Sequence, residues 1–282
     1  MKENRFERQI CFFGKKGQSI LKNTHVCIVG VGGIGSHLIQ QLAYLGVGSF
    51  SLIDHDRLET SNLNRLIGSY HDTPINIPKV SIMEQLIKII NPGIKVNKVF
   101  KSLISKSGFK AVKKSDFVFG CLDNDGARLK LNELCVAYEI PYIDTATEII
   151  LETLDYGGRV VSVIDKSRCL YCLDLISPDE ARLYLENPNR RKDEDDIYGV
   201  PKKLLEEKSP AVVTINGIIA SIASTEFLLH RTGIRDAKPY LKYNGKTGIL
   251  TLNIDEPKDG CYCCKTIRGK RKKAELEKDI LD

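Results

Sequence analysis

The chain has 282 residues, 42% of them hydrophobic and 28% charged, with nine cysteines and a formal net charge of +6. This balance is that of a globular protein with one large or two small α/β domains. The start of the chain has no apolar secretion signal, and the apolar stretch at 215–229 is shorter than the roughly 20 residues of a membrane helix. We therefore expect a cytoplasmic protein without membrane contact, whose thiols serve as metal ligands, nucleophiles or core residues.

The first half of the chain alternates short apolar runs with helical patterns. A polar helical segment over 1–24 precedes an apolar strand at 26–29, which enters a glycine loop at 30–35 and then a helix. A second strand at 50–54 completes a βαβ unit. Later patterns predict a helix at 79–90, strands at 94–100 and 116–122, a helix reaching 136, and a strand from 142. We therefore predict a doubly wound, Rossmann-like sheet with helices on both faces.

The pattern changes after about residue 150. Residues 158–164 and 248–254 are typical of antiparallel strands, and 210–229 of a long buried helix. Between them, residues 186–210 are dense in charge and predict a surface loop, and residues 265–282 form a basic tail. We predict one domain over 1–282, with a nucleotide-binding half at 1–150 and a substrate and zinc half at 151–282.

The glycine loop carries the first chemical signal. Gly30, Gly32 and Gly35 match G-x-G-x-x-G between a strand and a helix, where free backbone N–H groups and the helix dipole attract phosphate. Asp54 ends the second strand, near the position where an acidic side chain binds a ribose hydroxyl. These features alone would also suit an NAD-dependent oxidoreductase.

Further polar residues favour a triphosphate. Ser61, Asn62 and Arg65 lie in one loop, and Lys79 precedes a helix. Cationic side chains beside a nucleotide loop suit ATP better than a pyrophosphate already held by backbone amides. Asp123 follows a strand at the ligand-binding edge of the sheet and is placed to hold Mg²⁺.

Together the motifs resemble the ThiF/MoeB/HesA family, bacterial relatives of the ubiquitin-activating enzymes, from about residue 5 to 264. The resemblance implies a homodimer that binds Mg·ATP and adenylates the C-terminal carboxylate of a small ubiquitin-like sulfur-carrier protein or of a peptide. It rests on RFERQI at 5–10, the glycine loop, LIDHD at 52–56, SNLNR at 61–65, PKV at 78–80, and Asp123-Asn124 with Arg128.

The resemblance also implies roles for single residues. Asp54 would bind the ribose, Asp123 would hold magnesium, and Arg8 would reach the γ-phosphate from the neighbouring subunit. Asn62, Arg65 and Lys79 would contact the phosphates together with the glycine loop. The predicted catalytic residues are Arg8, Arg65, Lys79 and Asp123, and the predicted nucleotide site contains Gly30, Gly32, Gly33, Gly35, Asp54, Asp56, Ser61, Asn62, Arg65, Lys79, Asp123, Asn124 and Arg128.

Two C-x-x-C pairs form a second strong motif. They are Cys169 with Cys172 and Cys261 with Cys264, although Cys263 makes the second cluster ambiguous. Four thiolates suit a closed, tetrahedral structural zinc site, and the family resemblance places zinc at the same pairs. We expect this site to fasten the antiparallel strand region to the C-terminal segment.

Several functional alternatives remain open at this point. Thioester-forming members of the family carry a cysteine in the loop before the late helix, but residues 186–210 contain none, so covalent transfer is not expected. The substrate is a sulfur-carrier protein or, as the alternative, a ribosomal peptide C-terminus in microcin-type modification. The rivals from other classes are an NAD-dependent oxidoreductase and an inactive scaffold. Nucleic acid is not an expected partner, despite the basic tail.

Overall fold

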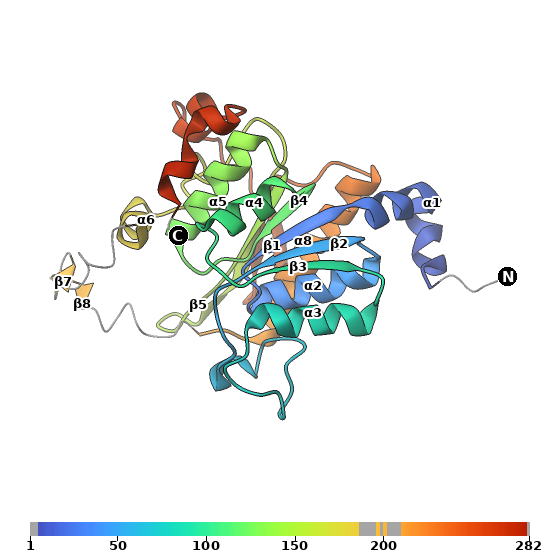
Figure 1. The fold of residues 1–282 in the computed structure, drawn as a ribbon. Helices are drawn as coiled ribbons and strands as arrows, with labels where there is room; N and C mark the ends of the chain where they lie inside the picture. Colours follow the sequence, from blue (N-terminus) through green and yellow to red (C-terminus); the bar gives the residue numbers. More distant parts are fainter. Residues whose placement is uncertain (1–4, 186–195, 198–199, 202–209, 281–282) are drawn as a thin grey trace.

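The computed structural model describes residues 5–185, 196–197, 200–201 and 210–280. An eight-stranded sheet crosses the molecule in the order β10-β9-β6-β5-β4-β1-β2-β3 (Figure 1). The strands are β1 His25–Val29, β2 Ser49–Ile53, β3 Lys95–Val99, β4 Phe117–Gly120, β5 Tyr142–Ile150, β6 Asp155–Val163, β9 Tyr240–Asn244 and β10 Ile249–Leu252. A separate pair joins β7 Asp196–Ile197 to β8 Val200–Pro201.

Parallel pairing joins β3, β2, β1, β4 and β5, whereas β6, β9 and β10 extend the sheet in antiparallel fashion. From β1 the chain first builds outward to β2 and β3, and it then returns to place β4 on the other side of β1. Ligands of open α/β sheets bind at this kind of reversal, outside the carboxyl ends of the strands. We therefore expect the ligand-binding site at the loops after β1 and β4.

Helices cover both faces of the sheet (Figure 1). α2 Gly33–Leu45, α3 Lys79–Ile90 and α8 Val213–Thr232 pack on one face, and α4 Lys106–Lys113 and α5 Asp125–Tyr138 on the other. Alternate residues of β1 serve the two cores, with Val26 and Ile28 facing one and Cys27 and Val29 the other. α1 Glu7–Asn23 packs against α8, and α6 Pro178–Leu185 against α5.

Within the described ranges, α8 is the one helix long and apolar enough to span a membrane. Its neighbours are α2, α1, β5 and β6, which is the environment of a core helix. Ile219, Ala220 and Phe227 are fully buried there, and the Phe227 ring lies 4.9 Å from that of Phe117 in β4. Packing inside the protein accounts for this apolar sequence.

The predicted doubly wound sheet with added antiparallel strands is confirmed, and α3 begins and ends at the predicted residues. α4, α6 and β9 were not predicted from the sequence. α4 and α6 have eight residues each and β9 has five, so their periodic patterns are short. The predicted charged loop at 186–210 lies almost wholly outside the described residues, and the division of the domain at residue 150 stays a prediction.

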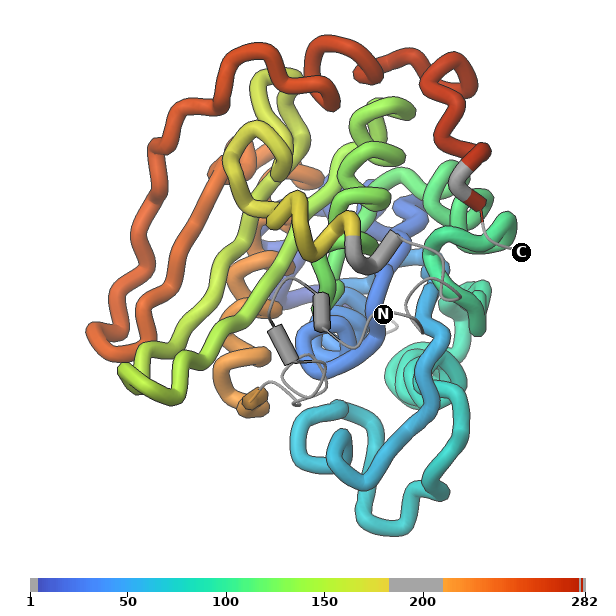
Figure 2. Tube along the Cα trace, turned by 90° about the vertical axis from the view of Figure 1, so that its left-hand side faces the viewer, coloured from blue at the N-terminus to red at the C-terminus, as the bar shows by residue number. Residues whose placement is uncertain are grey.

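The C-terminal segment crosses one end of the molecule. Figure 2 shows it in red, running from the β9 and β10 hairpin towards α4. It includes the π-helical turn Cys263–Ile267 and the 3₁₀ turns Arg271–Ala274 and Leu276–Asp279. An ion pair between Glu277 and Lys113 joins this segment to α4. Ile267 and Leu276 of this segment also belong to the same core cluster as Cys27 of β1.

Candidate functional site

The glycine loop packs directly against the end of β4. Gly30 has φ +87°, and a Cβ at this position would lie 2.3 Å from the carbonyl oxygen of Cys121, so only glycine fits. α2 begins at Gly33 without a capping hydrogen bond from the Gly32 position. Its first N–H groups therefore remain available, and the positive end of the helix dipole faces the loop. This arrangement can hold an anion.

Asp54 ties the end of β2 to the glycine loop. Its carboxylate accepts hydrogen bonds from the backbone N–H groups of Val31 and Asp56, both at 2.8 Å. Burial raises the pKa of Asp54, and these hydrogen bonds together with nearby Lys79 oppose the rise. Each carboxylate oxygen accepts one of these two bonds and retains a lone pair for a ligand hydroxyl. The predicted ribose contact is compatible with this geometry and stays a prediction.

Two of the predicted cationic residues lie beside this loop. Lys79 opens α3, is 9% exposed, and places Nζ 2.8 Å from Oδ2 of Asp56. Arg65 donates from Nη1 to the Ser61 carbonyl and to Oδ1 of Asn64, and its Cδ would lie 3.7 Å from a Cβ on residue 33. The structure therefore brings Arg65 against the glycine loop and Lys79 to the adjacent strand end.

The remaining polar residues of that loop serve its own turn. Oδ1 of Asn62 accepts from the Glu59 N–H at 3.1 Å, as part of a capping box on the 3₁₀ helix Thr60–Asn62. The Ser61 hydroxyl donates to Glu59 at 3.1 Å. These contacts fix the loop that presents Arg65. Direct phosphate contacts from Ser61 and Asn62 stay predictions.

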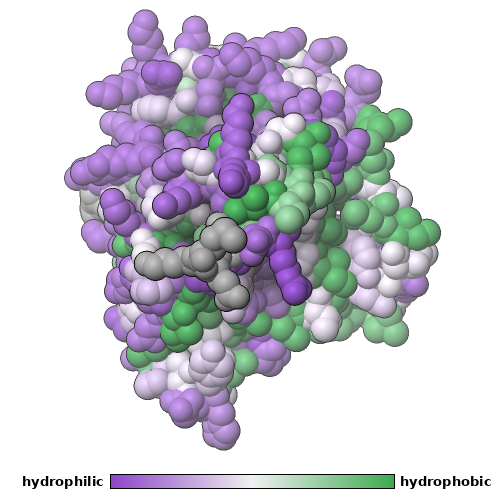
Figure 3. Space-filling view, turned by 90° about the vertical axis from the view of Figure 1, so that its right-hand side faces the viewer, coloured by the Kyte–Doolittle hydropathy of each residue, from purple (hydrophilic) through white to green (hydrophobic). Residues whose placement is uncertain are grey.

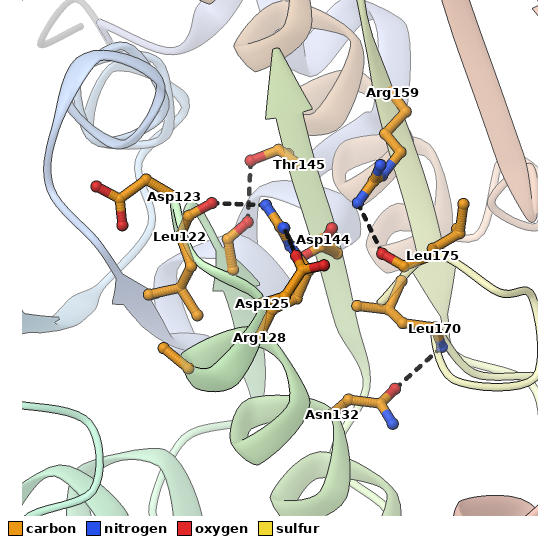
Figure 4. Close-up of polar contacts among 12 residues, drawn as sticks. Leu122, Asp123, Asp125, Arg128, Asn132, Asp144, Thr145, Arg159, Leu170 and Leu175 are labelled. Atoms are coloured by element: carbon orange, nitrogen blue, oxygen red, sulfur yellow. Dashed lines mark hydrogen bonds and ion pairs between the residues drawn. The ribbon is translucent and has the colours of Figure 1, made fainter. Parts of the chain in front are cut away.

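Arg128 holds the turn between β4 and α5 (Figure 4). Its guanidinium donates to Asp125 at 2.6 Å, to the Leu122 carbonyl at 2.6 Å, and to fully buried Asp144 at 3.3 Å. Burial alone would lower the pKa of Arg128, but the two carboxylates raise it above its ordinary value. The Arg128 side chain is thus already bonded to three groups of the protein, and its predicted role in nucleotide binding stays a prediction.

Asp123 points away from this network in Figure 4 and is exposed at the carboxyl end of β4. Its neighbour Asn124 caps α5 by accepting from the Ala127 N–H at 2.8 Å and donates to Asp123 at 3.3 Å. The Asp123 carboxylate thus keeps most of its acceptor capacity. A hard cation such as Mg²⁺ suits an exposed carboxylate beside a phosphate-binding loop.

Arg8 lies near the C-terminal end of α2, opposite to the end that follows the glycine loop. It is exposed in the first turn of α1, and the next residue, Gln9, donates to the Leu45 carbonyl at 2.9 Å. Leu45 ends α2, whereas the glycine loop precedes the start of the same helix. The length of α2 therefore separates Arg8 from the glycine loop of its own chain.

The four cysteines of the C-x-x-C pairs converge. All their Sγ atoms lie within 4.8 Å of one another. Three of the separations are 3.7 Å for Cys169 and Cys261, 3.8 Å for Cys169 and Cys172, and 3.9 Å for Cys172 and Cys264. A tetrahedron with zinc–sulfur bonds of about 2.3 Å requires sulfur atoms about 3.8 Å apart. The residues therefore fit zinc.

Hydrogen-bond donors other than thiols reach two sulfur atoms of the cluster. The Cys169 N–H donates to Cys172 Sγ at 3.1 Å, and Arg268 donates to Cys264 Sγ at 3.3 Å. Hydrogen bonds from neighbouring thiols, Cys172 first, lower the pKa of Cys169, whereas the hydrogen bond with Cys169 raises the pKa of Cys172 and of Cys264. Cys263 is buried and lies within hydrogen-bonding reach of Cys169, outside the four-residue cluster.

Two further residues belong to this region, one against the glycine loop and the other bonded to the first in turn. Asn216, in the first turns of α8, places Nδ2 so close to Gly33 that a Cβ there would lie 2.2 Å away. Thr147 of β5 donates to Oδ1 of Asn216 at 3.3 Å. Both residues come from beyond the nucleotide-binding motifs, and no local pattern distinguishes them. Only an inspection of what faces Gly33 in the fold identifies them.

Comparisons with known proteins identify the family and the relatives of this chain. The model of the ThiF family matches residues 6–274. The molybdopterin-synthase adenylyltransferase of Escherichia coli K12 is 35% identical over 184 residues, which are 64% of this chain and 72% of the relative. The sulfur carrier protein ThiS adenylyltransferase of the same organism is 32% identical over 173 residues, 60% of this chain and 66% of the relative.

Other similar proteins are longer than the matched region. The adenylyltransferase and sulfurtransferase UBA4 of Yarrowia lipolytica is 32% identical over 62% of this chain, and the match spans 43% of UBA4. Among solved structures, E. coli MccB with MccA-N7isoASN has a TM-score of 0.73 at 20% identity, covering 93% of this chain and 75% of MccB. MccB with ATP gives a TM-score of 0.71 at 19% identity. These structures share the fold.

Proposed function

Because the chain belongs to the ThiF family, we propose that it is an ATP-dependent adenylyltransferase that activates the C-terminal carboxylate of a small ubiquitin-like sulfur-carrier protein. The observation that carries the proposal is the meeting of an uncapped α2 with Asp123 at the reversal point between β1 and β4. Arg65 and Lys79 lie on the β2 side of the same loop. Relatives named for activating ThiS or molybdopterin synthase support the choice of substrate.

The reaction requires positioning and charge neutralisation. An oxygen of the substrate carboxylate attacks the α-phosphorus of ATP in line, forming the acyl–phosphate bond as the bond to the β-phosphate oxygen breaks. Pyrophosphate leaves with the electron pair of that bond and its negative charge. The carboxylate is already ionised, so the enzyme needs no general base.

The side chains divide this work. The N–H groups at the start of α2 hold phosphate oxygens, and Arg65 and Lys79 neutralise their charge after exchanging their internal acceptors for the ligand. Asp54 accepts a hydrogen bond from the ribose. Asp123 holds Mg²⁺, which supplies charge neutralisation on the phosphates when it is bound. Arg128 keeps Asp123 in place by fixing the Leu122 carbonyl.

Three further features belong to the proposal. Zinc in the four-cysteine cluster fastens the segment after β6 to the C-terminal turn. A homodimer brings Arg8 of one subunit to the site of the other. A cytoplasmic location fits the nine cysteines, which are all unpaired as disulfides.

A second candidate substrate is a peptide C-terminus. The fold is shared with MccB, whose structures contain the peptide MccA. The absence of cysteine from residues 186–210 suits an acceptor other than an enzyme thiol. Wild-type protein is therefore tested with peptides as well as with carriers ending in Gly-Gly.

ATP–pyrophosphate exchange tests the proposal. We expect the wild type to catalyse exchange in the presence of its carboxylate substrate and Mg²⁺, and Asp123→Ala to lose at least about 100-fold in rate because it lacks a metal ligand. Asp236→Ala is the matched control, since that side chain is exposed and lies outside the site. The adenylation proposal is overturned if no carrier or peptide supports exchange and Mg·ATP does not bind. Reduction of NAD by the same protein would favour the oxidoreductase alternative.

A further inference from the structure

Asn216 is a buried residue whose side-chain oxygen is hydrogen-bonded to Thr147 and whose side-chain nitrogen faces the glycine loop. The residue is 3% exposed. Thr147 donates to its Oδ1 at 3.3 Å, and Nδ2 occupies the side of the amide that faces Gly33. Among the described residues no acceptor bonds Nδ2, which lies against Gly33. A donor that is held in place beside a phosphate-binding loop and has no acceptor within the described residues is available to a ligand.

Two helix N-termini meet at this amide. α2 starts at Gly33, α8 starts at Val213, and neither has a side-chain cap. α1 and α3 also lack a side-chain cap, whereas Ser105 and Asn124 cap α4 and α5. The uncapped ends of α2 and α8 leave free N–H groups and two positive dipole ends around Asn216. The contact between Gly33 and Asn216 therefore lies in a region built for negative charge.

The position also lies between the cationic residues after β2 and the antiparallel side of the sheet. Arg65 and Lys79, the cationic residues of the nucleotide side, come from the segments after β2. Asn216 and Thr147 come from α8 and β5, whose other neighbours are the antiparallel strands. A substrate carboxylate has to meet the α-phosphate between these two sides.

We propose that Asn216 is a catalytic residue, whose side-chain N–H donates a hydrogen bond to an oxygen of the phosphoryl group under attack, and that Thr147 positions it. The inference rests on the proposed adenylation. As the carboxylate attacks, negative charge on the phosphoryl oxygens shifts, and a donor already fixed in place stabilises it without reorganisation. Arg65 and Lys79 must first leave their internal partners, whereas the Asn216 donor is free in the resting structure.

The test compares near-isosteric variants in pyrophosphate exchange. Asn216→Leu keeps the shape and removes the donor, and we expect kcat to fall about 100-fold or more while the Kd for ATP changes less than about threefold. Thr147→Val removes the orienting hydroxyl and should lower kcat about tenfold, whereas Thr147→Ser keeps the hydroxyl and should restore it. Ser221→Ala, on an exposed part of the same helix, is the control and should match the wild type.

The outcomes separate the inference from the function on which it rests. Failure of the wild type to catalyse exchange overturns the adenylation proposal and, with it, this inference. An active wild type with an unchanged kcat in Asn216→Leu overturns the inference alone. A weakened Kd for ATP with an unchanged kcat overturns the catalytic role as well, because it indicates ground-state binding. If Asn216→Leu does not fold, equal kcat values for Thr147→Val and Thr147→Ser overturn the proposal.

Discussion

At the scale of single residues, some polar groups of the site are hydrogen-bonded to one another, whereas others remain available to a ligand. Arg128, Asp125 and Asp144 form the first kind, since they hold the β4 end by internal bonds. Asp123 and Asn216 form the second kind. Residue type alone does not distinguish them: Arg128 and Arg65 are both arginines near a strand end, and only Arg65 lies beside the glycine loop.

Cys121 illustrates why proximity to the site does not make a nucleophile. Burial raises its pKa to about 12, so about one thiol in 10⁴ is ionised at pH 8. We predict that iodoacetamide at pH 8 alkylates exposed Cys11 and leaves Cys121 unmodified, as measured by peptide mass spectrometry. Because the pKa is raised, labelling of Cys121 should increase about tenfold per pH unit above pH 8. Equal labelling of both thiols in the folded protein would contradict this, and labelling of both in urea is the control.

The positions of several site residues could be predicted from the sequence. The glycine loop, Lys79 and Asp123 follow strands or open helices, and their positions in the fold follow from the βαβ pattern. Asn216 and Thr147 are 69 residues apart, and each sits in an ordinary apolar or β-branched stretch. The contact of Asn216 with Gly33 and with Thr147 depends on how α8 packs against α2 and β5, which is a tertiary property without a local signal.

At the scale of elements, α3 could be predicted from its own sequence, whereas β9 depends on its partners in the sheet. α3 was predicted to its exact ends because a proline precedes it, its apolar residues repeat regularly, and Asn91-Pro92 follows it. β9 was missed because only Tyr240 and Leu241 of its five residues are buried. Its position in the sheet is set by pairing with β6 and β10 rather than by its own pattern.

The zinc cluster joins the segment after β6 to the C-terminal turn, so loss of the metal should lower the stability of the fold. We predict that chelation of the metal, or Cys169→Ser, lowers the melting temperature by about 10 °C and removes about one zinc per chain. Cys11→Ser is the control, because Cys11 is an exposed thiol outside the cluster. Metal analysis and thermal unfolding measure the two effects. A wild type purified without zinc, with the same melting temperature as Cys169→Ser, would show that the four thiols are only core residues.

At the scale of the whole molecule, the two halves of the sequence share one continuous sheet, since β5 pairs with both β4 and β6. The face that contains α1 carries apolar side chains among hydrophilic ones (Figure 3). Phe12 of α1 is 64% exposed, and Tyr44 near the end of α2 is 56% exposed. Large exposed aromatic side chains are typical of protein interfaces, which agrees with a proposed second copy of the chain.

A dimer with shared sites makes a sharp prediction from the position of Arg8, which the length of α2 separates from its own glycine loop. Arg8→Ala and Asp123→Ala should each be inactive in pyrophosphate exchange. After the two variants are mixed and allowed to exchange subunits, about half of the dimers are mixed, and each mixed dimer has one intact site. Exchange activity should therefore return to about a quarter of the wild-type value. If Arg8 acts within its own chain, every site in the mixture lacks one group and no activity returns. Full activity of Arg8→Ala alone would remove Arg8 from the mechanism.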